Sequence, residues 1–170
     1  DILVSISPFD GSADTLAIDR PFQRIICMSG TSVAAIDAVG ETRRICGISG
    51  VRYISSPSIR EMHVAEVGYD DRPDYEKIVA LHPDLLLAFQ TGPFIPAYVD
   101  KLRSLGIRVM FVYDHMENHP LARAEYIRFH ASLVGKTAQA DSLFREICDS
   151  YTATATAAKG HSLKKVLMNT

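Results

Sequence analysis

The chain has 170 residues, of which 47% are apolar and 22% are charged, and its 18 basic and 20 acidic side chains nearly balance. This composition is typical of an ordinary globular protein with one domain and part of a second, and the near-neutral charge disfavours nucleic-acid binding. No apolar run approaches the roughly 20 residues that a membrane-spanning helix requires.

The first segments predict a β-hairpin. Residues 2–6 and 15–18 are strand-like and flank the sequence Asp10-Gly11-Ser12, where Gly11 can supply the positive φ of a tight turn. The chain begins at Asp1 directly in this strand-like sequence, which is compatible with a processed or trimmed N-terminus.

Strands and helices then alternate along the chain. The expected strands are residues 24–28, 44–48, 64–68, 85–89 and 107–112; the expected helices include 33–39 and 98–105, each closed by a glycine. Residues 51–60 are expected to form a loop. The alternation predicts an α/β fold with a Rossmann-like parallel sheet, helices on both of its faces, and the N-terminal hairpin.

Residues 73–89 contain the clearest local signals. Asp74 can cap a short helix, Pro83 prevents that helix from continuing, and the apolar run 85–89 predicts a strand covered on both faces. One apolar face of the helix is expected to consist of Ile78, Val79 and Leu81. Glu76 then points away from this face near the helix start, either as a solvated first-turn acid or as a handle for a partner.

Ligands bind outside the carboxyl ends of the strands in parallel sheets. The loops of interest are therefore residues 29–32, 50–56, 90–94 and 114–119. In the second and third of these loops, Arg52, Tyr53, Gln90, Thr91 and Phe94 are candidates for ligand binding, as is Tyr113 after the last strand. Exposed aromatics beside an arginine suit a large flat or anionic ligand, although each ring could equally pack on its own domain.

The first loop, Ser29-Gly30-Thr31-Ser32, loosely resembles the Gly-x-Ser-x-Gly elbow of hydrolases, in which a sharp turn exposes a nucleophilic serine. The last glycine of that motif is absent here. A helix start that carries hydroxyls, or that binds a ligand through its N–H groups, is the favoured interpretation of these four residues.

The last loop places His115 and His119 on either side of Glu117. Two histidines four residues apart on a helix could share a metal, but Pro120 prevents a helix from running through His119. The favoured interpretation is a polar loop that leads to a helix cap. Contact with a bulky ligand and metal chelation are the alternatives.

The remaining sequence predicts two helices and the start of a strand. Residues 120–133 begin with proline and end before Gly135, and residues 137–159 form a long helix of ~34 Å at 1.5 Å per residue. Residues 164–170 begin a strand, either of a second domain or at the edge of the same sheet. The widely spaced Cys27, Cys46 and Cys148 are expected to be buried free thiols, with a Cys27–Cys46 bridge as the alternative.

From about residue 20 onward, the chain resembles the periplasmic binding proteins for ferric siderophores, haem and cobalamin, which are the solute receptors of ABC importers. The most specific segments are residues 76–85 (Glu-x-Ile-x-Ala-Leu-x-Pro-Asp-Leu) and 105–109 (Leu-Gly-Ile-x-Val). Residues 117–126 are similar to the iron-compound-binding branch of the family.

This resemblance implies two α/β lobes joined by a long helix, with the ligand clamped between them. Residues 1–136 are then the N-terminal ligand-binding lobe, 137–160 the connecting helix, and 161–170 the start of a truncated second lobe. Glu76 matches the acidic residue that docks onto arginines of the importer's membrane subunits.

The function that the resemblance implies is a receptor in the periplasm or cell envelope, either free or anchored by a lipid. It is expected to deliver an iron chelate, haem or cobalamin to an ABC importer. It is expected to catalyse no reaction and to need no resident metal or cofactor. Receptors for bare Zn²⁺ or Mn²⁺, and a hydrolase-like or flavodoxin-like enzyme domain, are the alternatives. The candidate ligand-binding residues are Ser29, Gly30, Thr31, Ser32, Arg52, Tyr53, Gln90, Thr91, Phe94, Tyr113, His115, Glu117 and His119.

Overall fold

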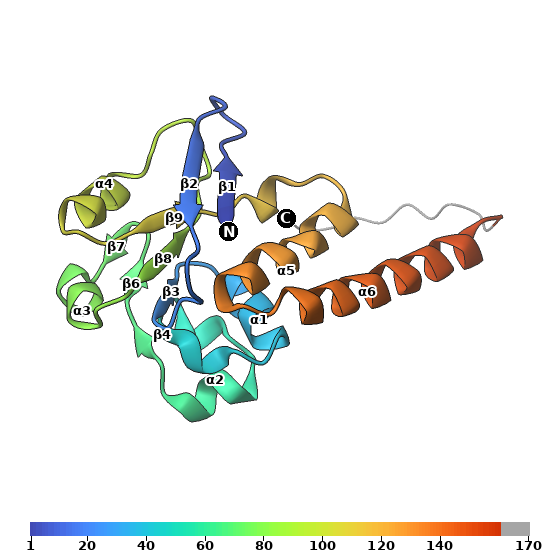
Figure 1. Ribbon diagram of the computed structural model, residues 1–170, viewed down its shortest axis with the longest axis horizontal. Helices are drawn as coiled ribbons and strands as arrows, with labels where there is room; N and C mark the ends of the chain where they lie inside the picture. The colour runs from blue at the N-terminus through green and yellow to red at the C-terminus, as the bar shows by residue number, and fades with distance from the viewer. Residues whose placement is uncertain (161–170) are drawn as a thin grey trace.

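The computed structural model describes residues 1–160 and contains a five-stranded sheet with the order β5–β4–β3–β8–β9 (Figure 1). Every neighbouring pair of strands is parallel. The strands are β3 (Ile25–Cys27), β4 (Ile45–Ile48), β5 (Ala65–Glu66), β8 (Leu85–Ala88) and β9 (Val109–Phe111). The predicted α/β class and parallel sheet are confirmed.

The two central strands are buried along their whole length. All residues of β3 and β8 are buried, and Ile25, Ile26 and Cys27 lie opposite Leu85, Leu86 and Leu87. Continuous apolar runs of this kind occur where helices cover both faces of a parallel sheet. The alternating side chains of each strand therefore enter two separate cores.

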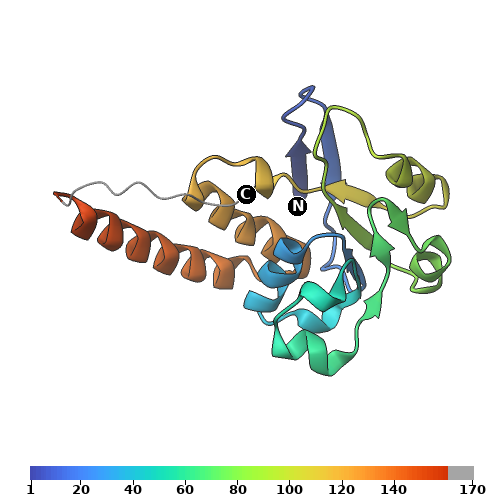
Figure 2. The same cartoon turned by 180° about the vertical axis from the view of Figure 1, so that it is seen from behind.

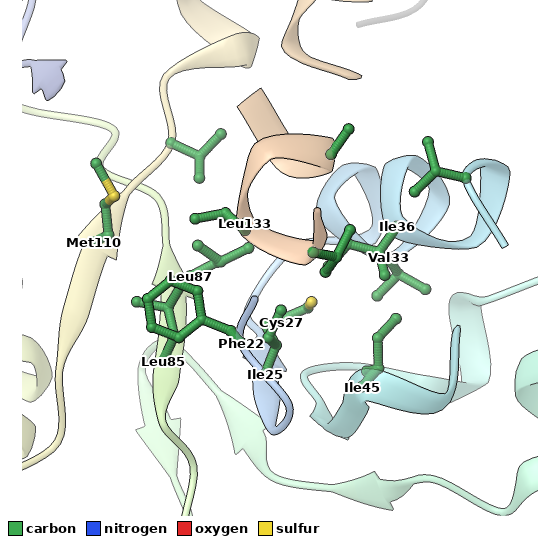
Figure 3. Close-up of a cluster of buried hydrophobic side chains, with 14 of the residues drawn as sticks. Phe22, Ile25, Cys27, Val33, Ile36, Ile45, Leu85, Leu87, Met110 and Leu133 are labelled. Atoms are coloured by element: carbon green, nitrogen blue, oxygen red, sulfur yellow. The ribbon is translucent and has the colours of Figure 1, made fainter. Parts of the chain in front are cut away.

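Helices α1 (Gly30–Ala38), α2 (Pro57–Met62) and α5 (Pro120–Val134) cover one face of the sheet. Figure 3 shows part of this core, in which Ile25, Cys27, Leu85 and Leu87 pack around Leu133 of α5. Helices α3 (Tyr75–Ala80) and α4 (Ala97–Ser104) cover the opposite face. Their buried side chains include Ile78, Tyr98, Val99 and Leu102.

The predicted N-terminal hairpin is confirmed. Strands β1 (Ile2–Ile6) and β2 (Ala13–Ala17) pair in antiparallel fashion, and Gly11 in the connection has a φ of 71°. The hairpin lies against the outer strand of the sheet, where the Ser5 hydroxyl donates a 2.8 Å hydrogen bond to the Phe111 carbonyl. A second, two-residue ladder joins β6 (Gly68–Tyr69) to β7 (Arg72–Pro73).

Three sequence predictions need correction. Residues 51–60 are not a loop, because they contain the 3₁₀-helix η2 (Val51–Tyr53) and α2, where Pro57 takes the first helical position that suits a residue without an N–H. Helix α1 begins at Gly30 rather than at residue 33, because the Ser29 side chain caps it. Val79 is 37% exposed and does not belong to the buried face of α3.

Shorter 3₁₀ turns precede β4 and follow β9, as η1 (Thr42–Arg44) and η3 (Asp114–Met116). The cap of α3 is as predicted, with the Asp74 carboxylate accepting a 3.0 Å hydrogen bond from the Lys77 N–H. Cys27, Cys46 and Cys148 are free, so the alternative of a Cys27–Cys46 bridge is wrong.

The predicted long helix is present as α6 (Thr137–Ala158). Its first turns pack on α5, through buried Ala140 and an ion pair of 2.8 Å between Arg128 Nε and Asp141 Oδ1. All residues from 149 to 160 are exposed, and Figures 1 and 2 show α6 extending beyond the sheet. The predicted strand 164–170 lies outside the described residues.

Within residues 1–160, none of the helices has both the length and the apolar character needed to cross a bilayer.

Gly47 provides a test of the packing on the α3 side of the sheet. A Cβ atom at this buried position of β4 would lie 2.7 Å from Val67 Cγ1 and 3.1 Å from Leu81 Cδ1. We expect Gly47→Ala to lower the free energy of unfolding by about 1–3 kcal/mol, as overpacking usually does, when measured by urea denaturation. The control is Gly92→Ala, since nothing lies within 4 Å of a Cβ there. Equal stabilities of the two variants would contradict the packing described.

Candidate functional site

The carboxyl ends of the parallel strands share one edge of the sheet, and the loops that leave them carry the candidate residues. Direct contacts join the loops after β8 and β9. A ring nitrogen of His115, Nε2, lies 3.0 Å from the Gln90 carbonyl oxygen, and the Tyr113 hydroxyl donates a 2.9 Å hydrogen bond to Gln90 Oε1. These two loops therefore form one connected surface rather than two separate loops.

The start of α1 presents two exposed residues, Gly30 and Thr31, and one buried hydroxyl, Ser32. Ser29 Oγ accepts a hydrogen bond from the Ser32 N–H, and its own hydroxyl donates to Ser32 Oγ over 3.1 Å. The favoured interpretation, a helix start that carries hydroxyls, agrees with this geometry. Only the first part of the motif faces outward.

Ser32 is 1% exposed and its hydroxyl lies 3.0 Å from Nε2 of His130 on α5. The other ring nitrogen, Nδ1, lies 2.7 Å from the Tyr126 carbonyl, so Nδ1 carries the proton and Nε2 accepts from the serine. Burial lowers the pKa of His130, which is neutral in this environment. The pair has no access for a substrate, and this burial opposes the alternative of a nucleophilic Ser32.

Gln90 and Tyr113 are buried, with exposed fractions of 4% and 6%. The expectation of an exposed aromatic at Tyr113 is therefore wrong. The N-terminal hairpin and its connection lie beside both residues, since Ser5 and Ser7 line the same small cavity of about 40 Å³ as Gln90 and Tyr113. Burial also raises the pKa of the Tyr113 phenol. Gln90 and Tyr113 therefore lie beneath the loops after β8 and β9 and hold them in position through hydrogen bonds.

The loop after β8 carries an aromatic side chain that is largely exposed to solvent. Phe94 is 85% exposed, and Thr91 is also exposed. The Gln90 amide donates a 2.8 Å hydrogen bond to the Gly92 carbonyl, which fixes the first part of this loop.

The loop after β9 is tied to α5. His119 is the N-cap of α5, where its Nδ1 accepts a 3.1 Å hydrogen bond from the Leu121 N–H, and its ring contacts Tyr151 of α6 edge-on. Arg123 Nε donates a 2.7 Å hydrogen bond to the carbonyl of half-buried Glu117, and its Nη2 reaches the His115 carbonyl. The helix-cap interpretation of this loop is confirmed.

The chelation alternative has no structural support in the part of the chain that is described. Residues 1–160 contain no group of three or more His, Cys, Asp or Glu side chains placed to hold a metal ion. His119 is engaged as a cap and His115 lies against Phe89, with ring centroids 6.1 Å apart. A cleft of about 440 Å³ lies beside His115, between α1, η3 and α5.

The loop after β4 forms a compact cluster with the residues that follow β5. The Arg52 guanidinium carbon lies 4.6 Å from the centroid of the Tyr53 ring and 5.8 Å from that of Tyr69. Arg52 Nη2 also donates a 2.6 Å hydrogen bond to the Tyr53 hydroxyl. We call Arg52, Tyr53 and Tyr69 the arginine–tyrosine cluster.

Sequence reasoning missed Tyr69, Glu66 and Arg123. The predicted strand 64–68 was a sufficient signal for Tyr69, because an aromatic residue directly after a parallel strand lies at the carboxyl edge. Glu66 acts through hydrogen bonds to backbone groups 15 and 16 residues away, and Arg123 through one to a carbonyl six residues away, neither of which a local sequence pattern indicates.

Glu76 lies apart from these loops, in the first turn of α3, and is exposed. The adjacent Lys77 pairs with Asp74 instead, with 3.4 Å between Nζ and Oδ2. A carboxylate is stabilised at a helix start by the helix dipole. The structure thus leaves the Glu76 side chain available to solvent.

Buried His130 makes the stability of the fold depend on pH. The unfolded chain binds a proton at His130 near pH 6.5, whereas the folded state binds it only at lower pH. The stabilisation is complete above this value, and it is lost as the pH falls toward the lowered folded pKa, by up to about 1.4 kcal/mol per pH unit. We expect urea denaturation between pH 7.5 and 5 to show a smaller loss for His130→Gln than for the parent.

The control for this measurement is His63→Asn, which removes an exposed imidazole at a left-handed position (φ 50°) that asparagine tolerates. Its pH dependence should match that of the parent. A parent and a His130→Gln variant with the same dependence would show that His130 does not titrate with unfolding.

The chain is similar in sequence to a known protein family. Residues 25–170 match the family described as periplasmic binding protein. An uncharacterized lipoprotein of Methanocaldococcus jannaschii is 25% identical over 148 residues, which cover 78% of this chain and 34% of that protein.

Solved structures share the fold. A petrobactin-binding protein of Bacillus subtilis has a TM-score of 0.71 at 14% identity, over 94% of this chain and 54% of its own. For an iron uptake ABC transporter substrate-binding protein of Streptococcus pneumoniae, the TM-score is 0.70 at 21% identity, over 94% and 55%. For a periplasmic haem-binding protein of Pseudomonas aeruginosa, it is 0.63 at 19% identity, over 81% and 50%.

The chain thus spans about half the length of these solved structures. The family match covers most of the sequence and includes the strand-end loops described above, apart from the hairpin. The chain belongs to the periplasmic binding protein family.

Proposed function

We propose that this chain is part of an extracytoplasmic solute receptor that binds an iron chelate, haem or cobalamin and delivers it to an ABC importer. The observation that carries the proposal is the open carboxyl edge of the sheet, where Arg52, Tyr53 and Phe94 are exposed in a member of this family. The solved structures with this fold include proteins named for petrobactin, haem and iron uptake.

In this proposal, residues 1–136 form one ligand-binding lobe, 137–160 connect it to a second, and 161–170 begin that second lobe. The uneven burial of α6 supports this division, because its first turns pack on α5 whereas residues 149–160 are exposed. The ligand would lie on the carboxyl edge of the first lobe and be covered by the second. The pocket would be largely preformed, as ligand sites usually are.

The ligand-facing groups in this proposal are Gly30 and Thr31 at the start of α1, the arginine–tyrosine cluster, and exposed Thr91 and Phe94. His115 borders the cleft beside α5, and Glu117 and His119 follow it in the same loop. Ser29, Ser32, Gln90 and Tyr113 hold these loops in position from beneath, through the hydrogen bonds described above.

The receptor would catalyse no reaction. The alternative of an enzyme that uses Ser32 has no supporting contact, since that hydroxyl is buried against neutral His130. A receptor for bare Zn²⁺ or Mn²⁺ also lacks support, because the described residues hold no cluster of metal ligands. An extracytoplasmic location agrees with the family, and lipid anchoring agrees with the name of the archaeal relative.

The direct test is ligand binding to the full-length protein. We expect ferric siderophores, haem or cobalamin to quench tyrosine fluorescence, because Tyr53 and Tyr69 lie at the proposed site. Tyr53→Phe is the matched variant, since it keeps the ring and removes only the hydroxyl. No quenching and no binding heat with any of the three ligand classes would remove the proposed function.

Glu76 is proposed to dock onto basic residues of the importer's membrane subunits. We expect Glu76→Ala to leave ligand affinity unchanged and to slow uptake about tenfold in a reconstituted importer, because one charge-assisted contact contributes on the order of 1.4 kcal/mol. Glu61→Ala, which removes another exposed carboxylate on α2, is the control and should transport normally. Uptake at the parent rate with Glu76→Ala would eliminate the assigned role.

A further inference from the structure

We infer that the arginine–tyrosine cluster recognises anionic oxygen atoms at the periphery of the ligand, so that the cargo is a negatively charged chelate rather than a neutral one or a bare cation. This inference rests on the proposed receptor function and narrows its substrate class. Three observations support it: the contacts that hold the Arg52 guanidinium, the hydrogen bonds that fix its loop, and the lack of a carboxylate partner for Arg52 within residues 1–160.

The loop that carries Arg52 is fixed by one carboxylate. Glu66 Oε1 accepts hydrogen bonds from the N–H groups of Gly50 (2.9 Å) and Gly68 (3.2 Å), and Glu66 Oε2 accepts one from Val51 (2.7 Å). A carboxylate that accepts several backbone N–H groups makes strong, charge-assisted hydrogen bonds. The backbone on both sides of the cluster is therefore anchored before any ligand arrives.

Gly50 gives the two rings their space. Its φ of 73° is left-handed, and a Cβ atom there would lie 3.0 Å from Tyr53 Cδ2 and 3.3 Å from Tyr69 Cε1. A larger residue at this position would strain the backbone and displace both rings. The sequence at Gly50 is thus matched to the cluster above it.

The guanidinium of Arg52 is preorganised without being neutralised. It lies within cation–π distance of both rings and donates to the Tyr53 hydroxyl. Within residues 1–160, no carboxylate lies at ion-pair distance from Arg52, whereas Arg44 and Arg103 each pair with one carboxylate and Arg128 pairs with two. A guanidinium has five N–H donors in a planar fork, so most of its donors remain for another partner.

These features select the chemistry of the partner. A planar guanidinium matches oxygen pairs such as carboxylates and catecholates, and aromatic rings at 70% (Tyr53) and 36% (Tyr69) exposure add flat surface for stacking. An unpaired positive charge repels a bare metal cation. A neutral chelate would gain the stacking but not the charge-assisted hydrogen bonds.

The experiment compares probes of different charge on the full-length protein. Isothermal titration calorimetry would measure binding of ferric tris-catecholate (trianionic), haemin (two carboxylates), ferric tris-acetohydroxamate (neutral) and cyanocobalamin (neutral). We expect an anionic probe to bind most tightly and its affinity to fall with added NaCl. A preference for catecholate over haemin identifies the phenolate oxygens as the recognised group, and the reverse preference identifies the carboxylates.

Variants then assign the effect to Arg52. We expect Arg52→Gln to weaken the anionic probe by about tenfold to a hundredfold, and Arg52→Lys to weaken it less, because lysine keeps the charge without the planar fork. Binding of the neutral probes should be unchanged in both variants. Arg43→Gln, at the opposite end of β4 in η1, is the matched control and should bind every probe as the parent does.

The possible failures are distinguishable. Tighter binding of a neutral probe, or an equal loss for neutral and anionic probes in Arg52→Gln, overturns the anionic assignment and leaves the receptor function standing. Binding of none of the probes, with thermal unfolding of the protein intact, overturns the receptor function together with this inference.

Discussion

The parallel pairing of β3 with β8 is the constraint on which the rest of the structure depends. Both strands are buried on both faces, and parallel strands need long crossover connections, which here include helices that cover the sheet. All strands then leave the sheet at the same edge. The loops that carry the candidate residues gather there as a consequence of the way the core is covered.

A second layer of contacts converts these loops into a fixed surface. In each case, a side chain satisfies backbone groups of a neighbouring segment: Glu66 holds the turn at Gly50, Ser29 caps α1, and Arg123 donates to the carbonyls of His115 and Glu117. Backbone groups that are paired in this way do not have to be reorganised when a ligand binds, which lowers the entropic cost of binding. The surface is therefore suited to a preformed pocket, with outward-facing groups on a rigid base.

Sequence patterns were sufficient for the fold because its main signals are local. The apolar run 85–89, the cap at Asp74 and the glycine after α5 each act within a few residues. The site was predicted less well, since burial at the sheet edge depends on distant segments. Tyr113 follows its strand as expected but lies beneath the N-terminal hairpin, and its hydroxyl pairs with Gln90. No periodicity in the sequence reports either contact.

Burial also distinguishes the first turns of the long helix α6 from its later part. Most helical stability in proteins comes from tertiary packing, yet every residue of α6 from 149 onward is exposed, and the edge-on contact of Tyr151 with His119 lies near the start of this exposed part. An exposed half of this length is accounted for if further structure contacts it, which the proposal of a second lobe supplies. The chain also spans about half the length of the solved structures that share its fold. One second lobe would therefore account for both exposed surfaces, since the lobe that packs on α6 would also close over the arginine–tyrosine cluster.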